Sequence, residues 1–137
     1  MIETNLAIVE QHMANEAHDP DSVLELYTDD IVQEFPNRDF VLRGKDNIAA
    51  NYKATFSSME NVQLEPLDRF ATSDRVVDDM IVRFRLVGDG LVNVPVLIGS
   101  DVVLRLVHVF HMKDGLIARE IVHEHYTAIQ DCARSGR

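Results

Sequence analysis

Apolar residues near the start of the chain recur at helical spacing. Between residues 2 and 13 they lie three or four positions apart, while polar residues that include Asn5 and His12 lie off this stripe. The pattern predicts an amphipathic helix that ends near His18. Asp19-Pro20 is typical of a capped helix start with proline in the first turn, so we expect a short second helix after it.

The spacing changes to that of strands in the second half of the chain. After Gly44 a third helix is predicted as far as Met59, and from Val62 onward apolar runs alternate with glycine-containing turns. Helices in front and strands behind predict an α+β fold, with three helices on one face of a curved, mainly antiparallel sheet that forms a hollow cone. The predicted strands are Ile31–Phe35, Phe40–Leu42, Val62–Leu67, Arg69–Thr72, Arg75–Val87, a segment around Leu91–Ile98, Val102–Met112 and Leu116–Tyr126.

Composition narrows the class of protein. A chain of 137 residues with 46% hydrophobic and 26% charged residues is expected to form one folded domain. Its formal charge of −10 disfavours nucleic acid and anionic membranes as partners. The single cysteine, Cys132, excludes an internal disulfide, and neither a signal peptide nor an apolar run of membrane-spanning length is apparent. We expect a cytoplasmic location.

Strand alternation predicts which side chains face the hollow. On Arg75–Val87 the face without arginine contains Asp78 and Phe84, and is the better interior face because it is otherwise apolar. On Val102–Met112 the same reasoning places His108 and Phe110 inside and Arg105 outside.

The last strand has two open assignments, because a change of one residue in the turn exchanges its faces. A three-residue turn, Lys113-Asp114-Gly115, is favoured because a left-handed glycine ends such turns. It places His108 opposite Glu120 and the even-numbered residues from Glu120 to Tyr126 inside. A two-residue turn, Asp114-Gly115, places His108 opposite Ile121, and His123 and His125 inside.

Three segments resemble the SnoaL-like group of the nuclear transport factor 2-like superfamily. They are Val23–Pro36 (VLELYTDDIVQEFP), Arg43–Ile48 (RGKDNI) and Phe110–Ile117 (FHMKDGLI). The resemblance covers roughly residues 1–128 and leaves a polar tail, residues 129–137. It implies a conical α+β fold, often a homodimer packed sheet to sheet, and no metal or other cofactor. Members include polyketide cyclases, isomerases, dehydratases, epoxide hydrolases and non-catalytic binding modules, so function is argued from the site.

His108 corresponds by position to a pocket histidine of the SnoaL-like polyketide cyclases. The position of their catalytic aspartate is occupied by Val122, and the nearest carboxylates are Glu120 and Glu124, two residues to either side. An imidazole beside a carboxylate in an apolar pocket is suited to proton abstraction near neutral pH. The predicted catalytic groups are therefore His108 with Asp78 or Glu124.

Other side chains are predicted to contact a ligand. They are Glu34, Phe84, Phe110, Glu120, His123, His125 and Tyr126. His123 and His125 also form a His-x-His pair of the kind that binds zinc or copper, but the sequence lacks further ligands at metal-site spacing, and we predict no metal.

Two functions of different classes remain open. One is a cofactor-independent isomerase, cyclase or lyase that acts on a small, largely apolar organic molecule. The other is a non-catalytic ligand-binding or dimerisation module of the same fold. The outer face of Val102–Met112 carries Val103, Val107 and Val109, which predicts a homodimer that covers this apolar band.

Overall fold

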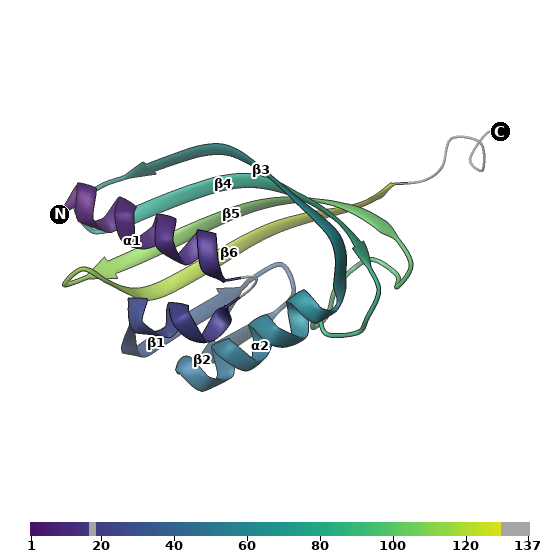
Figure 1. Ribbon diagram of the computed structural model, residues 1–137, viewed down its shortest axis with the longest axis horizontal. Coiled ribbons are helices and arrows are strands. Elements are labelled where there is room, and N and C mark those ends of the chain that lie inside the picture. Colours follow the sequence, from purple (N-terminus) through teal and green to yellow (C-terminus); the bar gives the residue numbers. More distant parts are fainter. Residues whose placement is uncertain (17–18, 130–137) are drawn as a thin grey trace.

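Within residues 1–16 and 19–129, which the computed structural model describes, six strands form a single bent sheet in the order β2-β1-β6-β5-β4-β3. The helices lie on one side of this sheet (Figure 1). The predicted α+β fold is therefore confirmed. The elements are α1 (Ile2–Asn15), the 3-10 helix η1 (Pro20–Leu26), β1 (Tyr27–Phe35), β2 (Phe40–Arg43), α2 (Lys45–Ser57), β3 (Met59–Ala71), β4 (Arg75–Leu86), β5 (Asp101–Lys113) and β6 (Leu116–Ile129).

The buried face of α1 differs from the predicted stripe. Asn5, Val9 and His12 are fully buried, whereas Ile2 is 46% exposed. Positions i, i+4 and i+7 share one face of a helix, so this helix directs two polar side chains and one valine toward the sheet. The prediction that His12 lies off the buried face was wrong.

The strands are antiparallel to their neighbours, except that β1 and β6 run parallel. The predicted pair Val62–Leu67 and Arg69–Thr72 forms one edge strand, β3, which tolerates Pro66 because an edge needs fewer ladder hydrogen bonds. The strand predicted around Leu91–Ile98 is absent from the described residues: this segment forms turns, with Asn93 in the left-handed region. Both edges of β5 are already paired, with β4 and β6.

The hairpin between β5 and β6 combines a two-residue turn with a bulge. Lys113 pairs with Leu116, and Asp114 and Gly115 both have positive φ angles, as a type I′ turn requires. The register then shifts by one residue at Ala118. His108 consequently pairs with Val122, so both predicted pairings, with Glu120 and with Ile121, were wrong.

Because of the bulge, the residues of β6 that face the interior are the same ones that the three-residue turn predicted. Phe110 pairs with Glu120, and Leu106 pairs with Glu124, so both glutamates share the inner face with His108. His123 and His125 are exposed on the opposite face. The single extra residue in β6 therefore decides which side chains face the interior.

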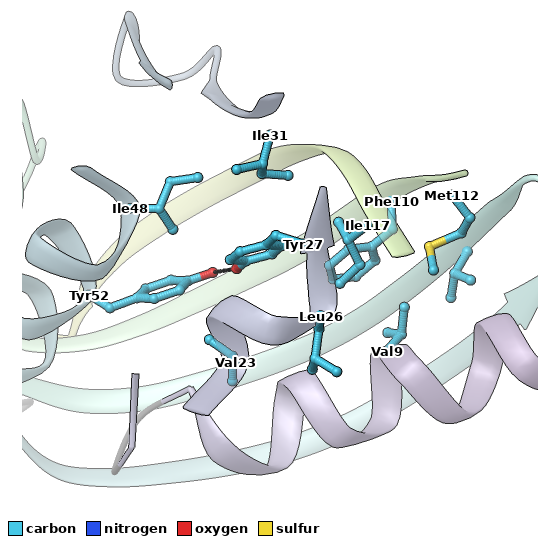
Figure 2. Packing of buried hydrophobic residues seen from close by; sticks show 11 residues of the cluster. Val9, Val23, Leu26, Tyr27, Ile31, Ile48, Tyr52, Phe110, Met112 and Ile117 are labelled. Atoms are coloured by element: carbon cyan, nitrogen blue, oxygen red, sulfur yellow. Dashed lines mark hydrogen bonds between the residues drawn. The ribbon is translucent and has the colours of Figure 1, made fainter. Parts of the chain in front are cut away.

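The interior contains two hydrophobic clusters. The first packs α1, η1 and α2 against the part of the sheet near the β5–β6 turn, and Figure 2 shows Tyr27 and Tyr52 of this cluster with their hydroxyl groups in contact. The second cluster gathers residues of β4, β5 and β6 around Phe35 and Leu91. None of the helices in residues 1–16 and 19–129 has the length and apolarity needed to cross a membrane.

Candidate functional site

A cavity of about 100 Å³ lies among α1, α2 and the inner face of the sheet. Its walls are mostly apolar, and its polar groups are concentrated on β1, β5, β6 and α2. The lining residues on which the argument depends are Glu16, Gln33, Arg38, Tyr52, Thr55, His108, Glu120, Glu124 and Tyr126. Met13, Leu64 and Met80 are among the apolar residues of the wall.

Three ionisable residues form a polar row across the centre of the sheet. Asp78 on β4, His108 on β5 and Glu120 on β6 are buried, with exposed fractions of 3%, 4% and 1%. Each lies along its strand between one residue of the first hydrophobic cluster and one of the second. The alternation of the strands therefore brings three polar side chains together at the boundary between the two clusters.

His108 lies between the two carboxylates of the polar row. Its Nε2 is 3.6 Å from Oε2 of Glu120, and its Nδ1 is 3.8 Å from Oδ2 of Asp78. The other oxygen of Asp78 accepts a hydrogen bond of 2.7 Å from Nε of Arg69. Arg69 is partly exposed, so the polar row extends from the cavity to the surface of β3.

The environment stabilises the protonated form of His108. Burial disfavours the charged ring, but the Asp78 carboxylate and the negative charge of Glu120 outweigh this effect and raise the pKa of His108 to about 9. Burial raises the pKa of Glu120, and the charge of His108 opposes that change. An imidazolium and a carboxylate of increased basicity thus lie side by side at the cavity wall.

Glu120 is held by polar groups from other elements. Its Oε1 accepts hydrogen bonds from Nε2 of Gln33 at 3.2 Å and from the hydroxyl of Tyr52 at 3.4 Å. The Gln33 amide also donates to the Tyr52 hydroxyl at 2.9 Å. These contacts orient the carboxylate and leave its Oε2 toward His108.

A second buried histidine adjoins the same network. Nε2 of His12 is 2.6 Å from the Tyr27 hydroxyl and 3.1 Å from that of Tyr52. Burial, with a contribution from the charge of His108, lowers the pKa of His12 to about 3, so this ring is neutral at pH 7. Burial raises the pKa of the nearby Glu16 carboxyl to about 8.

An ion pair occupies another part of the cavity wall. Nε and Nη2 of Arg38 donate to the two carboxylate oxygens of Glu124 at 2.9 and 3.3 Å, and the Tyr126 hydroxyl donates to Glu124 at 2.7 Å. The guanidinium also lies over the rings of Phe35 and Phe40. Glu124, predicted as a partner of His108, is therefore bound to Arg38.

Several predicted ligand contacts lie away from the cavity. Glu34 and His123 belong to the outer face, where Glu34 accepts a hydrogen bond of 2.6 Å from Arg119. His125 is exposed on the same face because of the bulge at Ala118. Phe84 and Phe110 are on the inner face, but each is buried in a hydrophobic cluster and does not line the cavity.

Sequence reasoning missed part of the site. Gln33 and Tyr52 line the cavity, and His12 adjoins their network from α1. Gln33 carried a usable signal, since its position between the apolar residues Ile31 and Phe35 gives it the same face as both. Arg38 and Glu124 are 86 residues apart in the sequence, so no local sequence pattern predicts their contact.

Among the described residues, no three His, Cys, Asp or Glu side chains lie close enough together to bind a metal ion. The His123 and His125 side chains are on the outer face, whereas Asp78 and His108 are on the inner face. Because the sheet separates them, these four residues cannot share one ion. Cys132 lies outside the described residues.

A bent sheet with helices on one side and a cavity between them is the architecture of nuclear transport factor 2-like proteins. A protein of this class from Burkholderia xenovorans superposes with a TM-score of 0.70 at 17% identity, covering 93% of this chain and 92% of that one. A provisionally assigned SnoaL-like polyketide cyclase from Jannaschia sp. CCS1 superposes with a TM-score of 0.77 at 18% identity, covering 90% and 87%. At identities this low, the superpositions show that the fold is shared and no more.

The chain belongs to the SnoaL-like domain family, whose model matches residues 9–120. An epoxide hydrolase from Mycobacterium tuberculosis is similar in structure as well, with a TM-score of 0.68, 18% identity and coverage of 90% and 84%. A comparison with curated proteins gives no match.

Proposed function

We propose that this protein is a cofactor-independent acid–base enzyme that binds a small organic molecule in the cavity and moves a proton within it. The observation that carries the proposal is the position of His108, which lies at the wall of a mostly apolar cavity within 4 Å of both the Glu120 and the Asp78 carboxylates. The reaction classes that need such a pair and little else are isomerisation, cyclisation and elimination.

In this mechanism the two groups have complementary roles. Glu120 removes a proton from a carbon next to an electron-withdrawing group, because burial raises the pKa of its carboxyl and strengthens it as a base. Protonated His108 donates its proton to the atom on which negative charge develops. Transfer from Glu120 to His108 across the 3.6 Å contact restores both groups, so no net proton is gained or lost.

Asp78 and Arg69 act as positioning residues. Asp78 stabilises the imidazolium from the side opposite Glu120, and Arg69 orients the Asp78 carboxylate. Gln33 and Tyr52 hold Glu120 in the same way. These contacts fix the orientation of both reacting groups before a ligand binds, as proton transfer requires.

The proposal is tested by solvent deuterium exchange. A panel of small ketones, enones and epoxides is incubated with the protein in D₂O, and incorporation or turnover is followed by NMR. We expect at least one compound to react, and Glu120→Gln and His108→Gln each to slow it by roughly 10²–10⁴-fold, the usual contribution of a general acid or base. Exposed His123→Gln is the matched control.

Unchanged activity in Glu120→Gln would contradict the assigned base. Binding of panel compounds without exchange or turnover of any of them would instead favour a non-catalytic ligand-binding module.

We also propose that a second copy of the chain covers the outer face of the sheet. Val107, Val109 and Ile121 are only half-buried there, and Phe70 on the edge strand β3, which β4 separates from β5, is 53% exposed. A contiguous apolar surface of this kind is unfavourable in water unless it is covered. Sedimentation velocity at micromolar concentration is expected to show a dimer that Val107→Lys dissociates, and a monomer at all concentrations would contradict the proposal.

A further inference from the structure

Opposite charges on the cavity wall are already paired among the described residues. Arg38 neutralises Glu124 across a 2.9 Å contact, and His108 faces Glu120 at 3.6 Å. The fifth ionisable group, the Glu16 carboxyl, keeps its proton at pH 7 because burial raises its pKa to about 8. A charged ligand would lose its hydration in the cavity and would find no free opposite charge to bind. The cavity therefore favours an uncharged ligand.

Three buried polar atoms of residues in the wall have no hydrogen-bond partner among the described residues, and they belong to Gln33, Thr55 and His108. The side-chain oxygen of Gln33, a residue that is only 1% exposed, is unpaired, although its amide nitrogen donates to both Tyr52 and Glu120. Thr55 contributes a second unpaired oxygen to the same wall. A buried acceptor without a donor is costly, so a ligand that supplies the donor gains affinity.

The orientation of the Gln33 amide follows from its neighbours. A reversed amide would place its oxygen 3.2 Å from Oε1 of Glu120, so that two acceptors would face each other without a proton between them. With the nitrogen toward Glu120, the oxygen of Gln33 is left as an acceptor without a donor; because this atom is covered in the structure, a ligand reaches it only if neighbouring side chains move.

The size of the cavity limits the ligand. Its volume is about 100 Å³. A dry apolar cavity of about 150 Å³ in another protein accommodates benzene. The cavity is thus suited to a molecule of no more than about one ring, and the apolar wall formed by Met80, Val82 and Leu104 suits the body of such a molecule.

We infer that the ligand of this cavity is an uncharged molecule of about single-ring size with a hydroxyl or N–H donor, which the side-chain oxygen of Gln33 accepts. Gln33 thereby selects the ligand in addition to positioning Glu120. The inference rests on the proposed function, because it assigns the ligand class of the same cavity. It makes a separate claim, however, since it concerns binding and not proton transfer.

The test compares phenol, toluene and anisole by calorimetry or NMR titration at pH 7. Phenol and toluene have nearly the same shape, and anisole keeps an oxygen but lacks the donor. We expect phenol to bind roughly fivefold to tenfold more tightly than either of the others, the range for one added hydrogen bond to a buried acceptor. The comparison needs only the wild-type protein, so it does not depend on whether a variant folds.

A substitution then identifies the acceptor. Gln33→Met keeps the length of the side chain and removes its oxygen, and the ratio of phenol to toluene affinity is expected to fall to near one. Gln63→Met makes the same change on the exposed edge strand β3 and is the matched control, with the wild-type ratio expected.

Three results would overturn the inference. Equal affinities for phenol, toluene and anisole in the wild type would show that no donor is selected, while the cavity itself would stand. A phenol preference that persists in Gln33→Met would show that a different group accepts the donor. Failure of all three compounds to bind would overturn the inferred ligand class, whereas the proposed function would still be decided by the exchange experiment with ketones, enones and epoxides.

Discussion

The stability of the protein is predicted to depend on pH through His108. The pKa of this histidine is raised from its ordinary value of 6.5 to about 9 in the folded state. The folded protein therefore binds this proton more tightly than the unfolded chain does. The resulting contribution to stability is fully present below pH 6.5 and is lost as the pH rises to about 9.

The magnitude follows from the same pKa values. A change from 6.5 to about 9 corresponds to about 3 kcal/mol of unfolding free energy. The ring is buried, with 5% of its side chain exposed, so screening by water removes little of this contribution. Glu16 also contributes to stability, and its contribution is lost as the pH rises from about 4.5 to 8. The pH dependence of wild-type stability would therefore combine the titrations of Glu16 and His108.

The assay therefore compares wild type with His108→Gln in urea unfolding from pH 6 to pH 10. The Glu16 contribution cancels only in part, because the charge of His108 opposes the rise in the Glu16 pKa and this opposition is lost in the variant. We expect the stability advantage of wild type over the variant to shrink by about 3 kcal/mol between pH 6 and pH 10. His123→Gln, on the exposed outer face, serves as the control. Parallel pH curves for wild type and His108→Gln would refute the electrostatic coupling of the polar row.

Two substitutions and one deletion test the packing that supports the site. Arg38→Met leaves the Glu124 carboxylate buried without its cation and is expected to cost about 3–5 kcal/mol in chemical unfolding; a loss below ~1 kcal/mol would contradict the buried ion pair. Gly90→Ala would place a Cβ against the carbonyl oxygen of Ala54, too close for the backbone to stay in place, and should lower stability by about 1–3 kcal/mol in the same assay; an unchanged stability would contradict this close packing. Deletion of Ala118 removes the bulge but leaves the pairs on either side of it, Ile117 with Met112 and Arg119 with His111, in regular succession, so the variant should keep a dispersed NMR spectrum; an unfolded spectrum would refute the assigned register.

The inner and outer faces of β4 and β5 could be predicted from the sequence, because strand alternation has a fixed period of two. The face of β6 was predicted correctly from a turn that the protein does not have. A type I′ turn at Asp114-Gly115 followed by a bulge at Ala118 exposes the same side chains as a three-residue turn. A bulge has no composition signal in one sequence, so the pairing itself could not be derived.

The predicted site was incomplete for a different reason. Strand alternation predicted that Asp78 and His108 both face the interior, and the register of β4 on β5 then places them opposite each other. The favoured register placed Glu120 opposite His108, whereas the structure places Val122 there with a glutamate two residues to either side. Arg38 binds Glu124, a long-range contact that the sequence does not show, and Glu120 is the one that lies beside His108. His12 enters from a helix whose buried face is defined by its packing on the sheet, a long-range property that helical periodicity alone did not show.

The most direct test of the polar row is an NMR titration of the His108 ring in wild type and in Glu120→Gln. The proximity of the two residues predicts an apparent pKa of about 9 in wild type and a clear decrease in the variant, because one of the negative charges that stabilise the imidazolium is removed. A wild-type pKa at or below 6.5, or the same pKa in both proteins, would contradict the assignment of His108 and Glu120 as a coupled acid–base pair.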